Sequence, residues 1–159
     1  MILYHGSNVT VRKPRLFASA RALDFGAGFY LTTSIEQAEQ WAKIVQKRQM
    51  SGVATISEFA VDDIKFDTLR IRRFTVPDTE WLLYISTNRK AKGLPFDYDV
   101  VTGPVANDNT MSVINMYLKG AYDEEETLKR LLPQKLKDQY AFKTEKALEL
   151  LVFTKDVVL

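Results

Sequence analysis

Leu3-Tyr4-His5-Gly6-Ser7 and Gly26-Ala27-Gly28-Phe29-Tyr30-Leu31-Thr32 are the two stretches that decide how the chain folds. The first places the only histidine, followed by a glycine and a hydroxyl, at the end of a short apolar run that we predict to be a strand. The second places a tyrosine inside another strand, which the chain enters through two glycines. Polar side chains at a strand end, beside a glycine that lets a ligand approach the backbone, are typical of a small-molecule cleft.

The order of these motifs resembles the NAD-binding core of ADP-ribosyltransferases of the diphtheria toxin and poly(ADP-ribose) polymerase type. More closely, the chain is similar to a bacterial family of that fold that carries only an unknown-function label. A third stretch, Asp138-Gln139-Tyr140-Ala141-Phe142, is similar to the strand that holds the glutamate of that family, with Gln139 at the glutamate position. The resemblance implies an α+β fold, an ADP-ribosyltransferase-like split antiparallel β-sheet with flanking helices and an NAD cleft.

The resemblance also implies roles for individual residues. His5 is expected to bind the adenosine ribose and the backbone of Gly6 the nicotinamide amide, with Ser7 assisting. Tyr30 is expected to lie against the nicotinamide, and Gly28 and Phe29 just before it are expected to belong to the same NAD-binding site.

The resemblance also implies a second aromatic ring on the other face of the nicotinamide, eleven residues after Tyr30. The residue at this position is Trp41. An indole suits a cationic pyridinium. The alternative is that Trp41 is a core residue of an amphipathic helix.

The glutamine at the glutamate position changes the expected chemistry. Cleavage between nicotinamide and ribose passes through an oxocarbenium-like state, which a carboxylate stabilises. Gln139 can hold the ribose hydroxyl but supplies no charge, so single transfer is more plausible than polymer formation. Another carboxylate is therefore a candidate, first Asp108 and then Glu145, although Asp108 also suits a helix cap and Glu145 the first turn of a helix. Asn107 is expected either to contact substrate or to form the turn.

Composition sets the limits of the fold and of the chemistry. With 159 residues, of which 46% are apolar, the chain can fill one core, and we expect a single domain over residues 1–159. The absence of cysteine excludes disulfides, thiolate nucleophiles and cysteine metal sites, and one histidine excludes a zinc site of several imidazoles, so no metal is expected. No window approaches a membrane span and no secretory signal opens the chain, so we expect no membrane partner and a cytoplasmic location.

The net charge of +2 is too small to imply nucleic acid by itself. The basic residues are nevertheless grouped, and we interpret the groups mainly as solvated faces. The first group flanks the proposed cleft, where a cation can meet a pyrophosphate. Asp24-Phe25-Gly26 matches the kinase metal-binding triplet, but no glycine-rich loop accompanies it, and we interpret it as a chance match. The three groups are Arg12, Lys13, Arg15 and Arg21; Arg70, Arg72 and Arg73; and Arg89, Lys90 and Lys92.

Periodicity and turn residues predict mixed strands and helices without regular alternation, which favours α+β. A capping box at Ser34-Ile35-Glu36-Gln37 predicts a helix whose apolar face holds Ile35, Ala38, Trp41, Ala42 and Val45. Further strands are expected at 53–61, 98–101, 140–142 and 151–158, and further helices at 78–88, 110–119, 124–132 and after Thr144.

We therefore predict an NAD-dependent mono-ADP-ribosyltransferase, with NAD as co-substrate and a macromolecular acceptor, protein or nucleic acid. By resemblance its use is as a bacterial toxin or regulatory enzyme, with an antitoxin or immunity protein as partner. The alternatives are a catalytically inactive module that binds NAD or ADP-ribose, and a nucleic-acid-binding domain that uses its arginine and lysine clusters.

Overall fold

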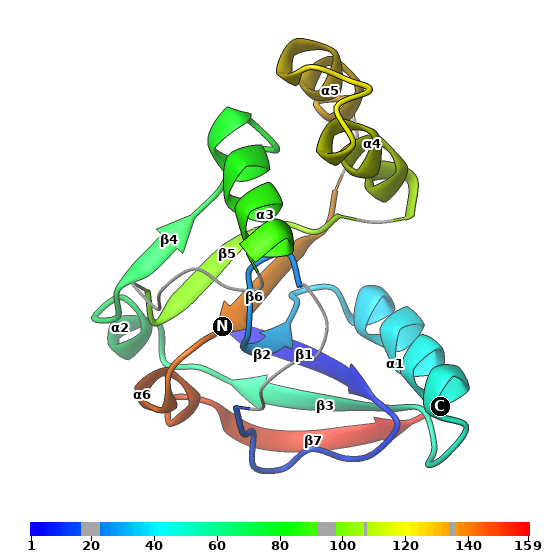
Figure 1. The fold of residues 1–159 in the computed structure, drawn as a ribbon. Helices are drawn as coiled ribbons and strands as arrows, with labels where there is room; N and C mark the ends of the chain where they lie inside the picture. The colour runs from blue at the N-terminus through cyan, green and yellow to red at the C-terminus, as the bar shows by residue number, and fades with distance from the viewer. Residues whose placement is uncertain (17–22, 92–97, 107, 134–135) are drawn as a thin grey trace.

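A computed structural model describes residues 1–16, 23–91, 98–106, 108–133 and 136–159. Within these residues seven strands form two sheets, and six helices accompany them (Figure 1). The first sheet has the spatial order β1 (Ile2–Ser7), β3 (Thr55–Ala60), β7 (Val152–Val158), and the second β2 (Phe29–Leu31), β6 (Asp138–Phe142), β5 (Val100–Pro104), β4 (Ile71–Arg73). The helices are α1 (Ile35–Gln49), α2 (Asp63–Phe66), α3 (Thr79–Ala91), α4 (Asp108–Leu118), α5 (Glu124–Leu131) and α6 (Glu145–Leu148). The predicted α+β class is confirmed.

The expectation of antiparallel pairing is wrong for one strand pair. β4 and β5 run parallel, whereas every other pair of neighbouring strands in the two sheets is antiparallel. A parallel pair needs a crossover connection, and α3 supplies it between these two strands. Neither β4 nor α2 was predicted, because each is only three or four residues long and too short for its periodicity to be recognised.

Among the described residues, one isolated bridge links the backbones of the two sheets. Tyr4 N–H donates to the Thr32 carbonyl at 2.8 Å, and Thr32 N–H donates to the Tyr4 carbonyl at 3.0 Å. Past this bridge β1 pairs on its other side with β3, and β2 with β6. The chain therefore forms a sheet that splits between β1 and β2, and we call the backbone of β1 from His5 to Ser7 the split edge.

The second sheet separates two hydrophobic cores. The inner core lies between the sheets and contains Leu3 and Phe59 of the first sheet and Phe29 and Phe142 of the second. The outer core covers the opposite face of the second sheet. Figure 1 shows α3 over this sheet with α4 and α5 beyond it. Their buried side chains are Trp81, Leu82 and Ile85 of α3, Ile114 of α4 and Leu131 of α5.

The helix α1 differs from its predicted packing. Ser34 Oγ accepts the Gln37 N–H at 3.2 Å, so the N-terminal cap is as predicted. Of the predicted apolar face, however, only Ala38 and Ala42 are buried. Small side chains let the helix approach β1 closely, so the larger apolar residues beside them do not reach the core. Trp41 is 44% exposed, and the interpretation of this residue as part of the core is wrong.

Candidate functional site

His5 lies at the split edge with its side chain held from two sides. Its Nδ1 lies 2.8 Å from the Tyr30 carbonyl, and its ring stacks on Phe29 with the ring centroids 4.2 Å apart. Burial lowers the pKa of His5, although the carbonyl contact opposes this effect. Because a carbonyl can only accept, Nδ1 carries the hydrogen and Nε2 is an acceptor. No group in the described part of the chain hydrogen-bonds Nε2, so the imidazole can accept a hydroxyl hydrogen there.

The histidine side chain takes the place of a strand partner. Continued antiparallel pairing from the Tyr4–Thr32 bridge would set Gly6 opposite Tyr30. The Tyr30 carbonyl instead accepts from His5. Alternate residues of a strand direct their N–H and C=O groups to opposite sides. The N–H and C=O of Gly6 therefore point to the same side as those of Tyr4, toward β2. Ser7 ends the strand, with its Oγ 3.5 Å from Asn8 Oδ1.

Gly6 is required by the helix packing as well as by its place at the split edge. A Cβ on this residue would lie 2.0 Å from the Ala38 carbonyl oxygen and 2.8 Å from the Ala42 nitrogen of α1. The sequence suggested that the glycine makes room for a ligand. The structure shows that the space where a side chain would stand is filled by α1. Only the N–H and C=O of Gly6 face the split.

Tyr30 points to the outer face of the second sheet. Its hydroxyl donates to the Gly26 carbonyl at 2.6 Å and accepts the Phe25 N–H at 3.1 Å. Burial raises the pKa of Tyr30, and the nearby negative charge of Asp24 adds to this effect. Tyr30 therefore closes the turn that leads into β2. In the same turn Gly28 allows close contact with β6, since a Cβ there would lie 2.9 Å from the Phe142 carbonyl.

Gln139 lies on the same face of the sheet as Tyr30. Tyr30 pairs with Ala141, and Gln139 is two residues along the same strand, so the two side chains are diagonal neighbours. Gln139 is 6% exposed, and its Nε2 lies 3.4 Å from the Pro104 carbonyl and 3.5 Å from Asp24 Oδ2. The structure thus places the three predicted residues, His5, Tyr30 and Gln139, on three adjacent strands.

A buried ion pair that the sequence interpretation missed lies beside Gln139. Asp24 is 7% exposed, and its Oδ1 accepts from Arg89 through Nε at 2.9 Å and through Nη2. Asp24 belongs to the triplet that we interpreted as a chance match. Arg89 was assigned to a solvated basic group. The spacing of α3 could have identified it, because Arg89 follows Ile85 at the same four-residue interval that separates Ile85 from Trp81.

The two other aromatic residues predicted to bind NAD, Phe29 and Trp41, lie in different surroundings. Phe29 lies in the inner core, where its side chain supports His5 instead of facing a ligand. Trp41 is covered by the Arg48 guanidinium, 5.5 Å from its ring centroid, and its proposed stacking on nicotinamide stays a prediction.

Of the acidic candidates, Asp108 is the first residue of α4, while Asn107 and the side chain of Asp108 lie outside the described residues. The backbone just before them does reach the site, since Ala106 N–H lies 3.4 Å from Asp24 Oδ2. Glu145 is exposed in the first turn of α6, which Thr144 caps, after the end of β6 farther from Gln139.

The mid-chain arginine group is engaged in ion pairs. Arg70 pairs with Asp99, Arg72 with Glu80 and Arg73 with Asp67. In the first basic group the Arg12 guanidinium lies over the Phe153 ring, 5.4 Å from its centroid.

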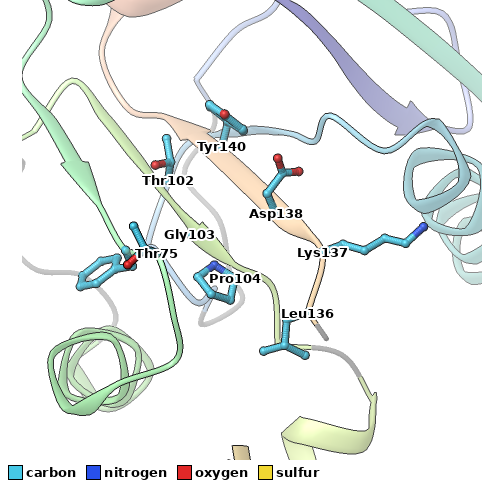
Figure 2. Close-up of a pocket in the computed structure, with 9 residues that line it drawn as sticks. Thr75, Thr102, Gly103, Pro104, Leu136, Lys137, Asp138 and Tyr140 are labelled. Atoms are coloured by element: carbon cyan, nitrogen blue, oxygen red, sulfur yellow. The ribbon is translucent and has the colours of Figure 1, made fainter. Parts of the chain in front are cut away.

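A shallow pocket of about 200 Å³ lies at the end of β5 and β6 (Figure 2). It is lined by Thr102 and Tyr140, with Asp138 near its edge, and the Lys137 side chain points away from it. Asp138 and Tyr140 alternate with Gln139 along β6, so they lie on the opposite face of the sheet. Asp138 already accepts from Thr32 and Thr33. This pocket therefore lies on the other side of the sheet from the Tyr30 and Gln139 side chains.

The residues that the structure describes contain no group of three or more acidic or histidine side chains that could hold a metal. None of the described helices is both long enough and apolar enough to cross a bilayer.

Comparison with known proteins places the chain in a family without an assigned activity. Residues 1–153 match the model of a family described as "Protein of unknown function (DUF3990)", and the chain belongs to this family. No curated protein and no solved structure matches the chain.

Proposed function

We propose that this member of the family is an NAD-dependent mono-ADP-ribosyltransferase with an ADP-ribosyltransferase-like fold. The observation that carries the proposal is the split edge. There a neutral imidazole, whose Nε2 is not hydrogen-bonded by any described residue, lies next to a glycine whose N–H and C=O face a strand that no longer pairs with it.

This pair of groups matches the chemistry of NAD. A primary carboxamide carries one carbonyl and two N–H groups, so it can pair with Gly6 as a neighbouring strand would. A ribose hydroxyl can donate to His5 Nε2. Nicotinamide and ribose thus find complementary groups at adjacent residues of one strand.

Gln139 supplies the next part of the proposed site. As the nicotinamide leaves, positive charge develops on the ribose, and an oriented acceptor near a ribose hydroxyl stabilises that state. The carbonyl oxygen of Gln139 is such an acceptor. Because the amide is neutral, its effect is smaller than that of a carboxylate, and we propose transfer of one ADP-ribose to a macromolecule instead of polymer growth.

The test combines binding and cleavage. Calorimetric titration with NAD should show binding, and His5→Ala should weaken it by about 1 to 3 kcal/mol because the hydroxyl loses its partner. Thr10→Val is the matched control, since it removes one hydrogen bond, to Asp156 at 2.8 Å, away from the split. Incubation with labelled NAD and a cell lysate should then transfer label to a macromolecule. Equal NAD affinity in wild type and His5→Ala, with no labelled product, would contradict the proposal.

A second candidate function is an inactive module that binds NAD or ADP-ribose. The observation that favours it is the neutral, buried amide of Gln139 where the resembled family has a carboxylate. Release of nicotinamide separates the two functions, because a module binds NAD without releasing it.

A further inference from the structure

Gln139 is held in one orientation by its neighbours. Its Nε2 faces the Pro104 carbonyl and a carboxylate oxygen of Asp24, and both of these groups can only accept. The opposite rotamer would set Oε1 against two acceptors, so the amide nitrogen must lie on this side. Oε1 is then directed away from them. In the described part of the chain no donor hydrogen-bonds Gln139 Oε1.

The acceptors around Gln139 are themselves fixed. The Pro104 carbonyl also accepts from Trp81 Nε1 at 3.0 Å, which anchors this end of β5 to α3. Arg89 occupies Oδ1 of Asp24 with two of its nitrogens and leaves Oδ2 for Gln139 and the Ala106 N–H. Both ends of this network lie on regular elements, α3 and β5.

We infer that Asp24 is the positioning residue of the site: it holds the Gln139 amide so that Oε1 faces a hydroxyl of the substrate, the ribose hydroxyl if the proposed function is correct. The carboxylate also polarises the amide, because a negative charge near its N–H groups makes Oε1 a stronger acceptor. Asp24 therefore acts on the substrate through the orientation and polarisation of the Gln139 amide, while its own charge is paired with Arg89. This role falls to a residue in the turn before β2.

The inference rests on the proposed function for its substrate, and the test separates the two. Asp24→Asn keeps the size of the side chain and removes its charge. We expect kcat for nicotinamide release to fall at least about tenfold, with KM for NAD changed by less than about threefold, since the interaction matters mainly in the transition state. The matched control is Asp99→Asn, a second buried aspartate with an arginine partner, which should leave both constants unchanged.

A double-mutant cycle tests whether Asp24 acts through Gln139. In a Gln139→Ala background Asp24→Asn should have almost no further effect on kcat. Equal effects of Asp24→Asn in both backgrounds, or an unchanged kcat in the single variant, would overturn the inference. If Asp24→Asn does not fold because Arg89 loses its partner, the double variant Asp24→Asn with Arg89→Met removes both charges and takes its place in the cycle.

Urea unfolding of the same variants gives a readout that needs no activity. If the wild type releases no nicotinamide, the proposed function fails, and the unfolding cycle alone decides whether Asp24 holds Gln139. Non-additive shifts of the urea midpoint support the contact, and additive shifts overturn it.

Discussion

Asp24 and Asp99 are both buried carboxylates, and both are paired with an arginine, but their surroundings differ. Asp99 accepts from the Arg70 N–H and the Thr144 hydroxyl, each at 3.0 Å. Burial alone would raise the pKa of Asp99, yet these donors outweigh it and hold the pKa below its ordinary value. The carboxylate therefore ties the loop before β5 to the loop after β6.

Asp24 is less completely satisfied. Its Oδ1 is held by Arg89, whereas its Oδ2 has only two long contacts, of 3.4 Å to Ala106 N–H and 3.5 Å to Gln139 Nε2. Hydrogen bonds of this length are weaker than the 3.0 Å bonds that Asp99 accepts. The comparison teaches that burial and an arginine partner do not distinguish a structural carboxylate from a functional one. The difference is the partner of the oxygen that the arginine does not hold. For Asp99 this is the Thr144 hydroxyl, and for Asp24 it is the amide of Gln139, a proposed site residue, together with the Ala106 N–H.

The largest expected difference between the Asp24 and Asp99 regions is the loss of stability when the arginine partner is replaced. The Arg89 side chain is 23% exposed, and Arg89→Leu leaves the Asp24 carboxylate buried without its cation, which we expect to lower the free energy of unfolding by about 3 to 5 kcal/mol. Arg70 is 64% exposed, and Arg70→Leu leaves the backbone and Thr144 donors of Asp99 in place, so about 0 to 1 kcal/mol is expected. Urea unfolding at neutral pH measures both. Equal losses would mean that the two carboxylates are equivalent.

The second prediction concerns the charge beside Asp24. From the sequence alone, Gln139→Glu is expected to preserve or raise NAD cleavage if Asp108 supplies the charge and the added negative charge is tolerated beside it. The structure adds a cost in stability. Asp24 Oδ2 lies 3.5 Å from Gln139 Nε2, so a carboxylate at position 139 would face two acceptors, and we expect Gln139→Glu to lower the free energy of unfolding by about 1 to 3 kcal/mol. Repulsion and burial would raise the pKa of the new carboxyl, so the loss should be smaller at pH 5 than at pH 8.

The control for this variant is Gln139→Met, which has a similar size and no titratable group. Its stability relative to the wild type should not change between these two pH values. A loss in Gln139→Glu that is the same at both pH values would show that the new side chain avoids Asp24.

A pH titration of stability sharpens the comparison further. In the Asp24 region Lys143 donates to the Phe25 carbonyl, and burial lowers the pKa of Lys143 to about 8 from 10.5. Between these values the unfolded chain binds more protons than the folded one, so the free energy of unfolding should rise with pH. Lys143→Met should lack this rise in urea unfolding from pH 8 to pH 10. If the free energy of unfolding rises equally with pH in the wild type and in Lys143→Met, groups other than Lys143 cause the rise.

The smallest expected effect is the change in the free energy of unfolding at acid pH, which reports on Asp99. Because the folded pKa of Asp99 is below its ordinary value of 3.8, its contribution to stability is present above that pH and is lost as the pH falls further. The wild type should therefore lose stability below about pH 4 faster than Asp99→Asn. Identical acid unfolding of the two proteins would show that Asp99 keeps an ordinary pKa.

Most regular elements follow from local sequence. The spacing of Trp81, Leu82 and Ile85 predicts both α3 and its buried face, and all three residues are buried. Thr144 caps α6 as predicted. The prediction of β5 was displaced toward its N-terminus, because Gly103 and Pro104 are typical of a turn and here continue the strand. They are tolerated there since Gly103 packs against Phe74 and the Pro104 carbonyl accepts from Trp81.

The sequence by itself determined the α+β class and the succession of the main elements, because these depend on residue order and local periodicity. The roles expected for His5, Tyr30 and Gln139 came from the resemblance of three short motifs to those of ADP-ribosyltransferases. Only the tertiary structure decided which carboxylate lies beside Gln139. Asp24 and Arg89 are 65 positions apart, and Asp24 and Gln139 are 115 apart. Their meeting depends on how β2 pairs with β6 and how α3 crosses the sheet. The tertiary structure also decided that α1 packs on β1 through Ala38 and Ala42 and leaves Trp41 exposed. The close contact at Gly6 sets the distance between the helix and the strand.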